Sequence, residues 1–437
     1  MRRKYIECNE MITTNVFFQQ YTLLGLAKYY FSNKVLKMSN PENQKLISWV
    51  RTLMILAGFW NQPISNNQII TKMFYVYSVI MRLSCILFWL SLVAELARLI
   101  IYQYELSIIV TSLSVVVTDS KIMIKMILYL KNNTLNLLED IIEKEGEVWA
   151  SRSEEIKALY RRKIAFLKVA VFIMGTSNFL TIIWLEISGV FTVIQHKEHN
   201  AIFNDSIESH VMYQTIFPLD RTNHVYWLLT TQVLWAWVGL IFNLVTQLIF
   251  VTILLYAASQ LEIMQVRFRN LIEQDFDIMA GEEKVAEKVK ELKGLIHDLQ
   301  YVVTFIKNFN KSTKYITMME FIFSSLDMAT VSVSLMKQQE YKSLWLLFFI
   351  VLLFTQLFLI GWTSNEIKVQ SEAIGDALYQ SKWYVLNKDG KQIILISIAR
   401  ARIPLMMTIG PFGPMTTNSI LLVLKAAYSY INIMMRG

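Results

Sequence analysis

The sequence predicts an all-α membrane protein with seven transmembrane helices in an inverted topology, N-terminus cytosolic and C-terminus extracellular. Composition is the first observation: apolar residues make up 54% of the 437 residues and charged residues only 17%. Length is the second, because several apolar stretches exceed the ~20 residues that a helix needs to cross a bilayer. The seven predicted spans cover residues 73–97, 106–130, 164–194, 224–258, 314–336, 343–363 and 415–435.

The third observation is the distribution of Lys and Arg between the spans. Segments 1–69, 131–163, 261–311 and 364–412 hold 8, 7, 8 and 6 of them, whereas 98–105, 195–223, 337–342 and the C-terminal end hold 1, 2, 2 and 1. Cytosolic loops are enriched in Lys and Arg, which sets the predicted orientation. The net charge of +8 is attributed to these loops, and no basic-aromatic motif predicts a nucleic-acid partner.

The first half of the chain divides at residue 69. Residues 1–69 form the predicted cytosolic N-terminal segment, and their apolar stretch at 49–60 is too short to span, so we expect an interfacial or packed helix. Residues 70–258 hold transmembrane helices one to four. The 37 positions from Val225 to Leu261 contain no charged residue, so the fourth helix must tilt or continue into the cytosol.

The next region, residues 259–313, is predicted to be a cytosolic helical extension that acts as an anchor. Its apolar residues recur at alternating spacings of four and three, which is a heptad seam. The seam consists of Val285, Val289, Leu292, Ile296, Leu299, Val303 and Ile306. Because such a seam must be buried, we expect a cytosolic helical bundle and a contact between subunits.

Transmembrane helices five and six are placed within residues 314–363, a second anchor segment in 364–412 and the last transmembrane helix in 413–437. Pro404 and the run Gly410–Pro414 cannot continue a helix. The last helix is therefore predicted to be split into a cytosolic piece near 385–405, a break, and a membrane piece from about Thr416.

The sequence contains no enzyme signature, since GxSxG, HExxH, GxxxxGK[ST] and CxxC are all absent. His196 and His199 lie three apart, but no Cys or second close pair completes a tetrahedral set. We therefore predict no enzyme activity, no metal site and no cofactor. Asn204 begins a glycosylation sequon on the predicted outer side.

Ionisable residues inside the spans are costly and mark either function or structural pairs. We expect most of them to be paired or to lie near helix ends; they are Arg82, Glu95, Asp119, Lys121, Lys125, Glu186, Glu320, Asp327 and Lys425. On the third span, small, polar and aromatic residues follow helical spacing and line either a cavity or a packed core. This stripe consists of Ser177, Leu180, Thr181, Trp184 and Ser188.

The last helix, residues 416–435, is less aromatic than the others. Ser429 and Ile433 share a face, four residues apart, and Asn432 adds a polar group. A face of small polar and apolar residues suits the wall of a narrow pore.

Motifs along the chain resemble those of insect odorant receptors. Leu424–Tyr430 is similar to the family's terminal Lys-x-x-Tyr-Ser-Tyr/Phe signature. Further matches are Gly361-Trp362, Asn365-Glu366, Ser371, Ala377, Tyr379, Trp383-Tyr384, Arg400, Pro404, Gly410 with Phe412, Phe217–Asp220 with Tyr226-Trp227, and Gly58–Trp60 with Pro63. Together they cover essentially the whole chain.

The resemblance implies a receptor subunit for odorants or pheromones in the plasma membrane of a sensory neuron dendrite, surrounded by membrane lipid. It implies a heterotetrameric, ligand-gated, non-selective cation channel formed with a shared co-receptor. It places a small volatile apolar ligand near Ser112, Ser177, Leu180, Thr181, Trp184 and Tyr226. The pore would be lined by Ser429, Asn432 and Ile433, with Ile433 as gate, and subunits would meet at Val289, Leu292, Ile296, Leu299, Tyr379 and Trp383.

Three alternatives are weighed against this interpretation. Gustatory receptors end in Thr-Tyr followed by Gln-Phe at fixed spacing, which does not follow Thr416-Thr417. G-protein-coupled receptors have the opposite orientation and carry Asp/Glu-Arg-Tyr and Asn-Pro-x-x-Tyr motifs that are missing here. A secondary transporter would show repeats and Gly/Pro-broken helices. The compact second cytosolic loop favours a ligand-tuned subunit over the longer co-receptor.

Overall fold

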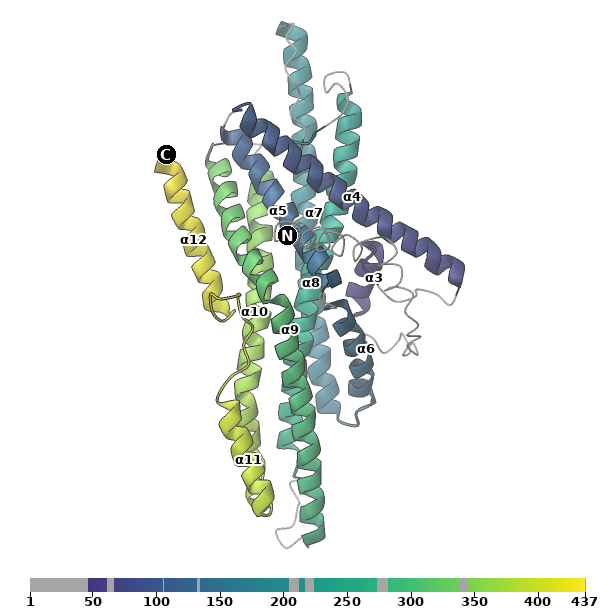
Figure 1. Cartoon of the computed structure of the whole chain (residues 1–437), viewed down its shortest axis with the longest axis vertical. Helices are drawn as coiled ribbons and strands as arrows, with labels where there is room; N and C mark the ends of the chain where they lie inside the picture. Colours follow the sequence, from purple (N-terminus) through teal and green to yellow (C-terminus); the bar gives the residue numbers. More distant parts are fainter. Residues whose placement is uncertain are drawn as a thin grey trace, which may run out of the picture.

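A computed structural model describes residues 46–60, 67–104, 106–131, 134–203, 212–216, 224–272, 282–337 and 344–436. The described residues are almost entirely helical and form a seven-helix membrane fold, drawn out along one axis (Figure 1). The spanning helices are α4 (Gln68–Ile101), α5 (Leu106–Lys131), α7 (Glu154–Phe203), α8 (Val225–Arg269), α9 (Glu282–Lys337), α10 (Leu344–Gln380) and α12 (Thr417–Arg436).

Each predicted span coincides with one of these helices. Five of them, α4, α7, α8, α9 and α10, are long and apolar enough to cross a membrane by length and composition. The other two are α5, whose interior carries Asp119, Lys121 and Lys125, and the 20-residue α12. The short apolar stretch near residue 50 forms α3 (Ser48–Leu56), which packs on α8 as expected.

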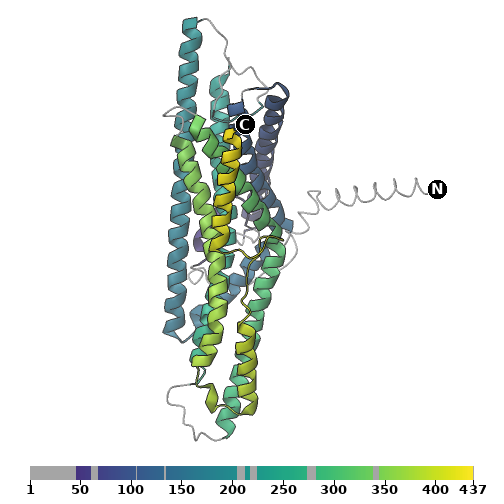
Figure 2. The same cartoon turned by 90° about the vertical axis from the view of Figure 1, so that its left-hand side faces the viewer.

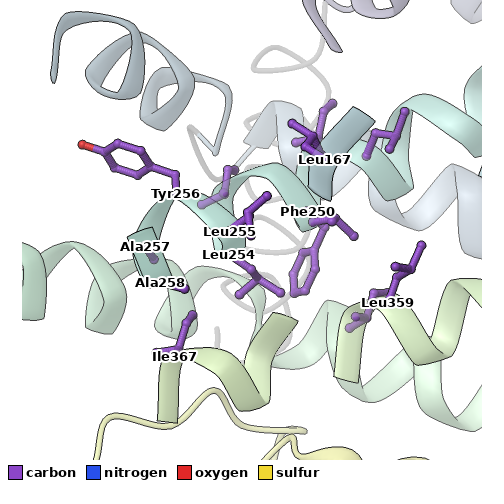
Figure 3. Close-up of a cluster of buried hydrophobic side chains, with 14 of the residues drawn as sticks. Leu167, Phe250, Leu254, Leu255, Tyr256, Ala257, Ala258, Leu359 and Ile367 are labelled. Atoms are coloured by element: carbon purple, nitrogen blue, oxygen red, sulfur yellow. The ribbon is translucent and has the colours of Figure 1, made fainter. Parts of the chain in front are cut away.

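The centre of the fold is α8, a 45-residue helix that confirms the expected continuation of the fourth span. From Leu244 to Ala258 every residue is buried and most are apolar, so this stretch is surrounded by protein on all sides. Figure 3 shows Phe250, Leu254 and neighbouring residues packed against Leu167 of α7 and against Leu359 and Ile367 of α10.

The heptad seam lies on the first half of α9, a 56-residue helix. Val289 and Leu292 are buried, and Ile296 and Leu299 pack partly buried against the same core. The predicted burial of the seam is therefore confirmed within a single chain, while a contact between subunits stays a prediction.

The predicted split of the last helix is also confirmed. Helix α11 (Lys388–Ala401) is followed by a non-helical connection, and α12 begins at Thr417. Gly410 and Gly413 adopt φ angles of 52° and 116°, which other residues rarely adopt. In Figures 1 and 2, α12 lies along the outside of the bundle with α11 below it.

The connection between α11 and α12 is fixed to the bundle by side chains of two other helices. The Asn310 side chain of α9 accepts a hydrogen bond from the Thr408 backbone N–H at 2.9 Å. The Ser371 hydroxyl of α10 accepts one from the Leu405 N–H, also at 2.9 Å. The start of α12 is therefore held by α9 and α10, the helices against which α12 packs.

Candidate functional site

A cavity of about 80 Å³ lies among α4, α5, α7, α8 and α10. Aromatic side chains form one wall. The Phe88 ring of α4 lies 5.5 Å from Tyr213 and 5.1 Å from Trp235 of α8, measured between ring centroids. Trp345 and Phe349 of α10 line the cavity as well. Most of its surface is therefore suited to an apolar or aromatic guest.

Two asparagines give the cavity a polar edge between α7 and α8. Asn243 Nδ2 donates a hydrogen bond to Asn178 Oδ1 at 3.0 Å, and Asn178 Nδ2 donates to the Met174 carbonyl at 2.7 Å. One turn along α7, the hydroxyl of Thr181 is directed back to the Ser177 carbonyl at 2.8 Å. These groups bond to one another and to backbone carbonyls of α7, so they add polarity without adding charge.

The charged group of the cavity is Asp119 of α5. Within the part of the chain that the structure describes, its carboxylate forms no hydrogen bond and no ion pair. Its neighbour Thr118 also lines the cavity, and the Thr118 hydroxyl donates to Asp327 Oδ2 of α9 at 3.0 Å. Asp119 is thus a carboxylate at the cavity surface without a protein cation.

The other ionisable residues of α5 are paired with α9. Lys121 Nζ lies 2.6 Å from Asp327 Oδ2, and Lys125 Nζ lies 2.5 Å from Glu320 Oε2. The Gln247 amide of α8 bridges the second pair, accepting from Lys125 and donating to Glu320. The prediction that most charges inside the spans form structural pairs is confirmed for these four residues.

The first span follows the same rule. Arg98 reaches Glu95 at 2.8 Å, and Arg82 donates to the Gly58 carbonyl at 2.7 Å. Gly58 has a φ of 70°, and a Cβ there would lie 2.8 Å from Ser78 Cα. The Gly58–Trp60 motif thus holds the end of α3 directly against α4.

An outer segment, residues 212–216, covers the cavity. Gln232 of α8 fixes it by accepting from the Tyr213 N–H at 3.2 Å and donating to the Tyr213 carbonyl at 2.8 Å. Met212 lies against Gly189 of α7 so closely that a Cβ at Gly189 would be 2.2 Å from Met212 Cγ. Close packing on α7 and hydrogen bonds to α8 therefore position Tyr213 over the cavity.

The sequence of the chain matches a family model described as "7tm Odorant receptor" over residues 105–428, a stretch that includes most of the cavity-lining helices. The chain belongs to the insect odorant receptor family. It is thus a member of a receptor family rather than of an enzyme family, and a multi-pass membrane protein.

Relatives within the insect odorant receptor family are distant in sequence. "Odorant receptor 10" of Aedes albopictus is 28% identical over 143 residues, 32% of this chain and 38% of that protein. "Odorant receptor Or2" of Anopheles gambiae is 23% identical over 188 residues, 43% of this chain and 50% of that protein. The matched regions span half or less of the length of these relatives.

The fold likeness extends further than the sequence likeness. The olfactory receptor OR5 from Machilis hrabei in complex with eugenol has a TM-score of 0.72 at 12% identity, covering 90% of this chain and 99% of that one. A second structure of the same receptor has a TM-score of 0.71 at 13% identity, covering 90% of this chain and 98% of that one. At this identity the likeness establishes the fold alone.

Of the six residues predicted to bind the odorant, Thr181 lines the cavity. The others lie elsewhere on the described surface or core. Leu180 is 41% exposed, Tyr226 is 64% exposed, and Trp184 stacks on Phe348 with 6.2 Å between centroids. Ser177 donates to the Met174 carbonyl, and Ser112 is buried two turns before Asp119.

The α7 face that lines the cavity is formed by Asn178, Thr181, Ile182 and Leu185. The predicted stripe thus lies about one residue out of phase with it. The polar signal that marks the site is the occurrence of Asn178 and Asn243 in otherwise apolar spans, together with Asp119. Asn204, the predicted glycosylation site, lies outside the described residues, as do Pro63 and residues 217–220.

The predicted pore residues lie on an open face of the single chain, whereas most of the predicted anchor residues are packed within it. Ser429, Asn432 and Ile433 are exposed on α12, whose other face, with Ile420, Val423 and Ala427, is buried against the bundle. Among the predicted anchor residues outside the seam, Tyr379 is exposed and Trp383 packs partly buried against the core.

Proposed function

We propose that this chain is the ligand-tuned subunit of an odorant-gated, non-selective cation channel in the plasma membrane of a sensory neuron, assembled with a co-receptor as a heterotetramer. The observation that supports it most is the aromatic cavity enclosed by five helices in the membrane-spanning part of an odorant receptor family member. A receptor for small volatile molecules needs such a site, because the ligand must be taken up from water into an apolar enclosure.

The cavity size limits the ligand and its affinity. A cavity needs about 10–15 Å³ to hold one water molecule, so about 80 Å³ suits roughly five to eight non-hydrogen atoms. A small ligand contributes at most ~1.5 kcal/mol per non-hydrogen atom, and usually much less. Modest affinity is therefore expected, together with fast release.

A contiguous set of contacts runs from the cavity to α12. Thr118 and Lys121 connect the cavity helix α5 to Asp327 of α9. Further along α9, the Lys314 carbonyl accepts a hydrogen bond from the Gly410 N–H at 3.0 Å, in the connection that leads into α12. We propose that a ligand with higher affinity for the open state shifts α9 and thereby α12.

In this proposal the exposed face of α12 lines the pore. Ser429 and Asn432 would supply polar groups, and Ile433 would form an apolar constriction that closes the pore by dewetting. Exposed apolar residues of the cytosolic anchor, including Tyr379 of α10 and Ile396 of α11, would contact neighbouring subunits. The pore requires several copies of α12, so the single chain supplies one wall of it.

The test is whole-cell current during an odorant panel, in cells that express the chain with and without the co-receptor, with G-protein signalling blocked. Fast cation currents that need both subunits are expected. Ligand responses that vanish when G proteins are blocked would overturn the channel and favour a receptor of the G-protein type. Currents from the chain alone would overturn the requirement for a co-receptor.

A further inference from the structure

We propose that the cavity selects small amines, whose ammonium group pairs with the carboxylate of Asp119. The inference rests on the proposed function, because it names the ligand class of the same cavity. It is carried by a carboxylate at a cavity surface that forms no ion pair with any of the residues the structure describes.

The first step is the balance of charges around Asp119. On α5 itself, Lys121 and Lys125 are engaged with Asp327 and Glu320 of α9 at 2.6 and 2.5 Å. In this described part of α5 and α9, two lysines therefore stand against three carboxylates, which are Asp119, Glu320 and Asp327. The unbalanced negative charge lies at the carboxylate that borders empty space.

Charged groups on the neighbouring helices do not supply the missing cation. Arg98 of α4 engages Glu95 at 2.8 Å. On α7, the ionisable side chain that follows the cavity-lining residues directly in sequence is a further carboxylate, Glu186, which is half-buried and is not part of the lining. An unpaired carboxylate in an apolar enclosure is unfavourable: it either takes up a proton or is joined by a cation or a strong hydrogen-bond donor. A bound ammonium group would provide both.

The second step is the aromatic wall of the same cavity. Phe88, Tyr213 and Trp235 form a contiguous group with centroid separations of 5.5 and 5.1 Å. Faces of aromatic rings attract cations, and the combination of a carboxylate with several rings is the chemistry that recognises amines. The same rings accept an apolar or aromatic body, so the ligand is an ammonium group on a small hydrocarbon.

The test uses three ligands of matched shape: benzylamine, benzyl alcohol and toluene. Binding is measured first, as the shift in unfolding temperature of the purified full chain in detergent at increasing ligand concentration. Benzylamine is expected to bind wild type about tenfold or more tightly than benzyl alcohol, the scale of one hydrogen bond between charged groups. Equal or weaker binding of benzylamine would overturn the proposal.

Asp119→Asn removes the charge and keeps the shape. It is expected to weaken benzylamine binding about tenfold or more and to change benzyl alcohol binding by less than about threefold, because the amide still forms a neutral hydrogen bond. Asp119→Glu is expected to retain the preference for the amine. Glu186→Gln, which removes a carboxylate outside the cavity, is the matched control and is expected to leave the preference unchanged.

Binding of benzyl alcohol by Asp119→Asn shows that this variant is folded. If Asp119→Asn binds neither ligand, Asp119→Glu is compared with wild type instead. Loss of the amine preference in Asp119→Glu would overturn the proposal. Currents evoked by the same ligands in cells with the co-receptor form the second readout. Amine-selective binding without any current would leave the ligand class standing and refute the channel. Currents that favour the alcohol or toluene would refute the ligand class and leave the channel.

Discussion

Breaking the buried ion pair between Lys125 and Glu320 is expected to destabilise the chain strongly. Their side chains are 7% and 3% exposed, and Lys125 Nζ lies 2.5 Å from Glu320 Oε2. Lys125→Met leaves Glu320 with the Gln247 amide as its remaining partner, at 3.1 Å. Removal of one partner of such a pair costs about 3–5 kcal/mol, because the remaining charge stays buried without compensation.

Replacing both partners distinguishes this cause from a loss of packing. In Lys125→Met with Glu320→Leu no charge remains, and an apolar replacement of a buried pair is often neutral or stabilising. The Gln247 amide then loses its bonds to Lys125 and Glu320 and keeps the one to Gln356 Oε1 at 3.5 Å, at a cost of about 1–3 kcal/mol. The double variant is therefore expected to be more stable than Lys125→Met alone, by about 2 kcal/mol.

The measurement is equilibrium unfolding of the purified chain in mixed detergent micelles, followed by Trp fluorescence. Lys144→Met is the matched control, because Lys144 forms an ion pair with Glu147 on the surface, with side chains 38% and 57% exposed. Its effect is expected to stay below about 1 kcal/mol. The reasoning is refuted if the double variant loses as much stability as the two single variants added together.

Two glycines at close helix contacts make further predictions. In Gly361→Val the new Cβ of α10 would lie 2.6 Å from Ile420 Cδ1 of α12 and push α12 toward the proposed pore. The maximal ligand-evoked current is therefore expected to fall. Adding Ile420→Ala, which removes the clashing atoms, should restore the current. In Gly189→Leu, Met212 is displaced from α7 and the cover of the cavity loosens. Overpacking costs about 1–3 kcal/mol, so the ligand concentration for half-maximal current should rise at least about fivefold, and Met212→Ala should reduce that rise. Unchanged dose–response curves would contradict both.

The fold could be predicted from sequence because hydropathy indicates each span, and the Lys and Arg content of each loop indicates the side of the membrane on which it lies. The lengths of the helices were harder to predict from the sequence. The third span was predicted at 164–194, whereas α7 runs from Glu154 to Phe203. Hydropathy reports where a helix meets lipid, and a helix that continues into water or into a protein bundle changes its composition without ending.

The orientation of α7 about its own axis was not readable in the same way. In a soluble helix the apolar face points inward, but in a membrane both lipid and protein core are apolar. The exposed side chains of Phe172 and Leu180 are as apolar as the buried Leu167 and Leu185. A stripe centred on Ser177 and Trp184 was therefore as plausible as the one the structure presents, and the two share Thr181.

The isolation of Asp119 follows from spacing, once the helices are placed. Lys121 and Lys125 lie four apart and share a face of α5, and Glu320 and Asp327 lie seven apart and share a face of α9. Two cations on one helix face therefore oppose two carboxylates on the other and form two pairs. Asp119, two positions before Lys121, projects from a different face and cannot join them.

What the sequence could not indicate is that this face borders a cavity with an aromatic wall, because Phe88, Tyr213 and Trp235 come from three separate segments. The isolated carboxylate of Asp119 therefore follows from the sequence of α5 alone, whereas the proposed selectivity of the cavity for a ligand depends on the assembled helix bundle.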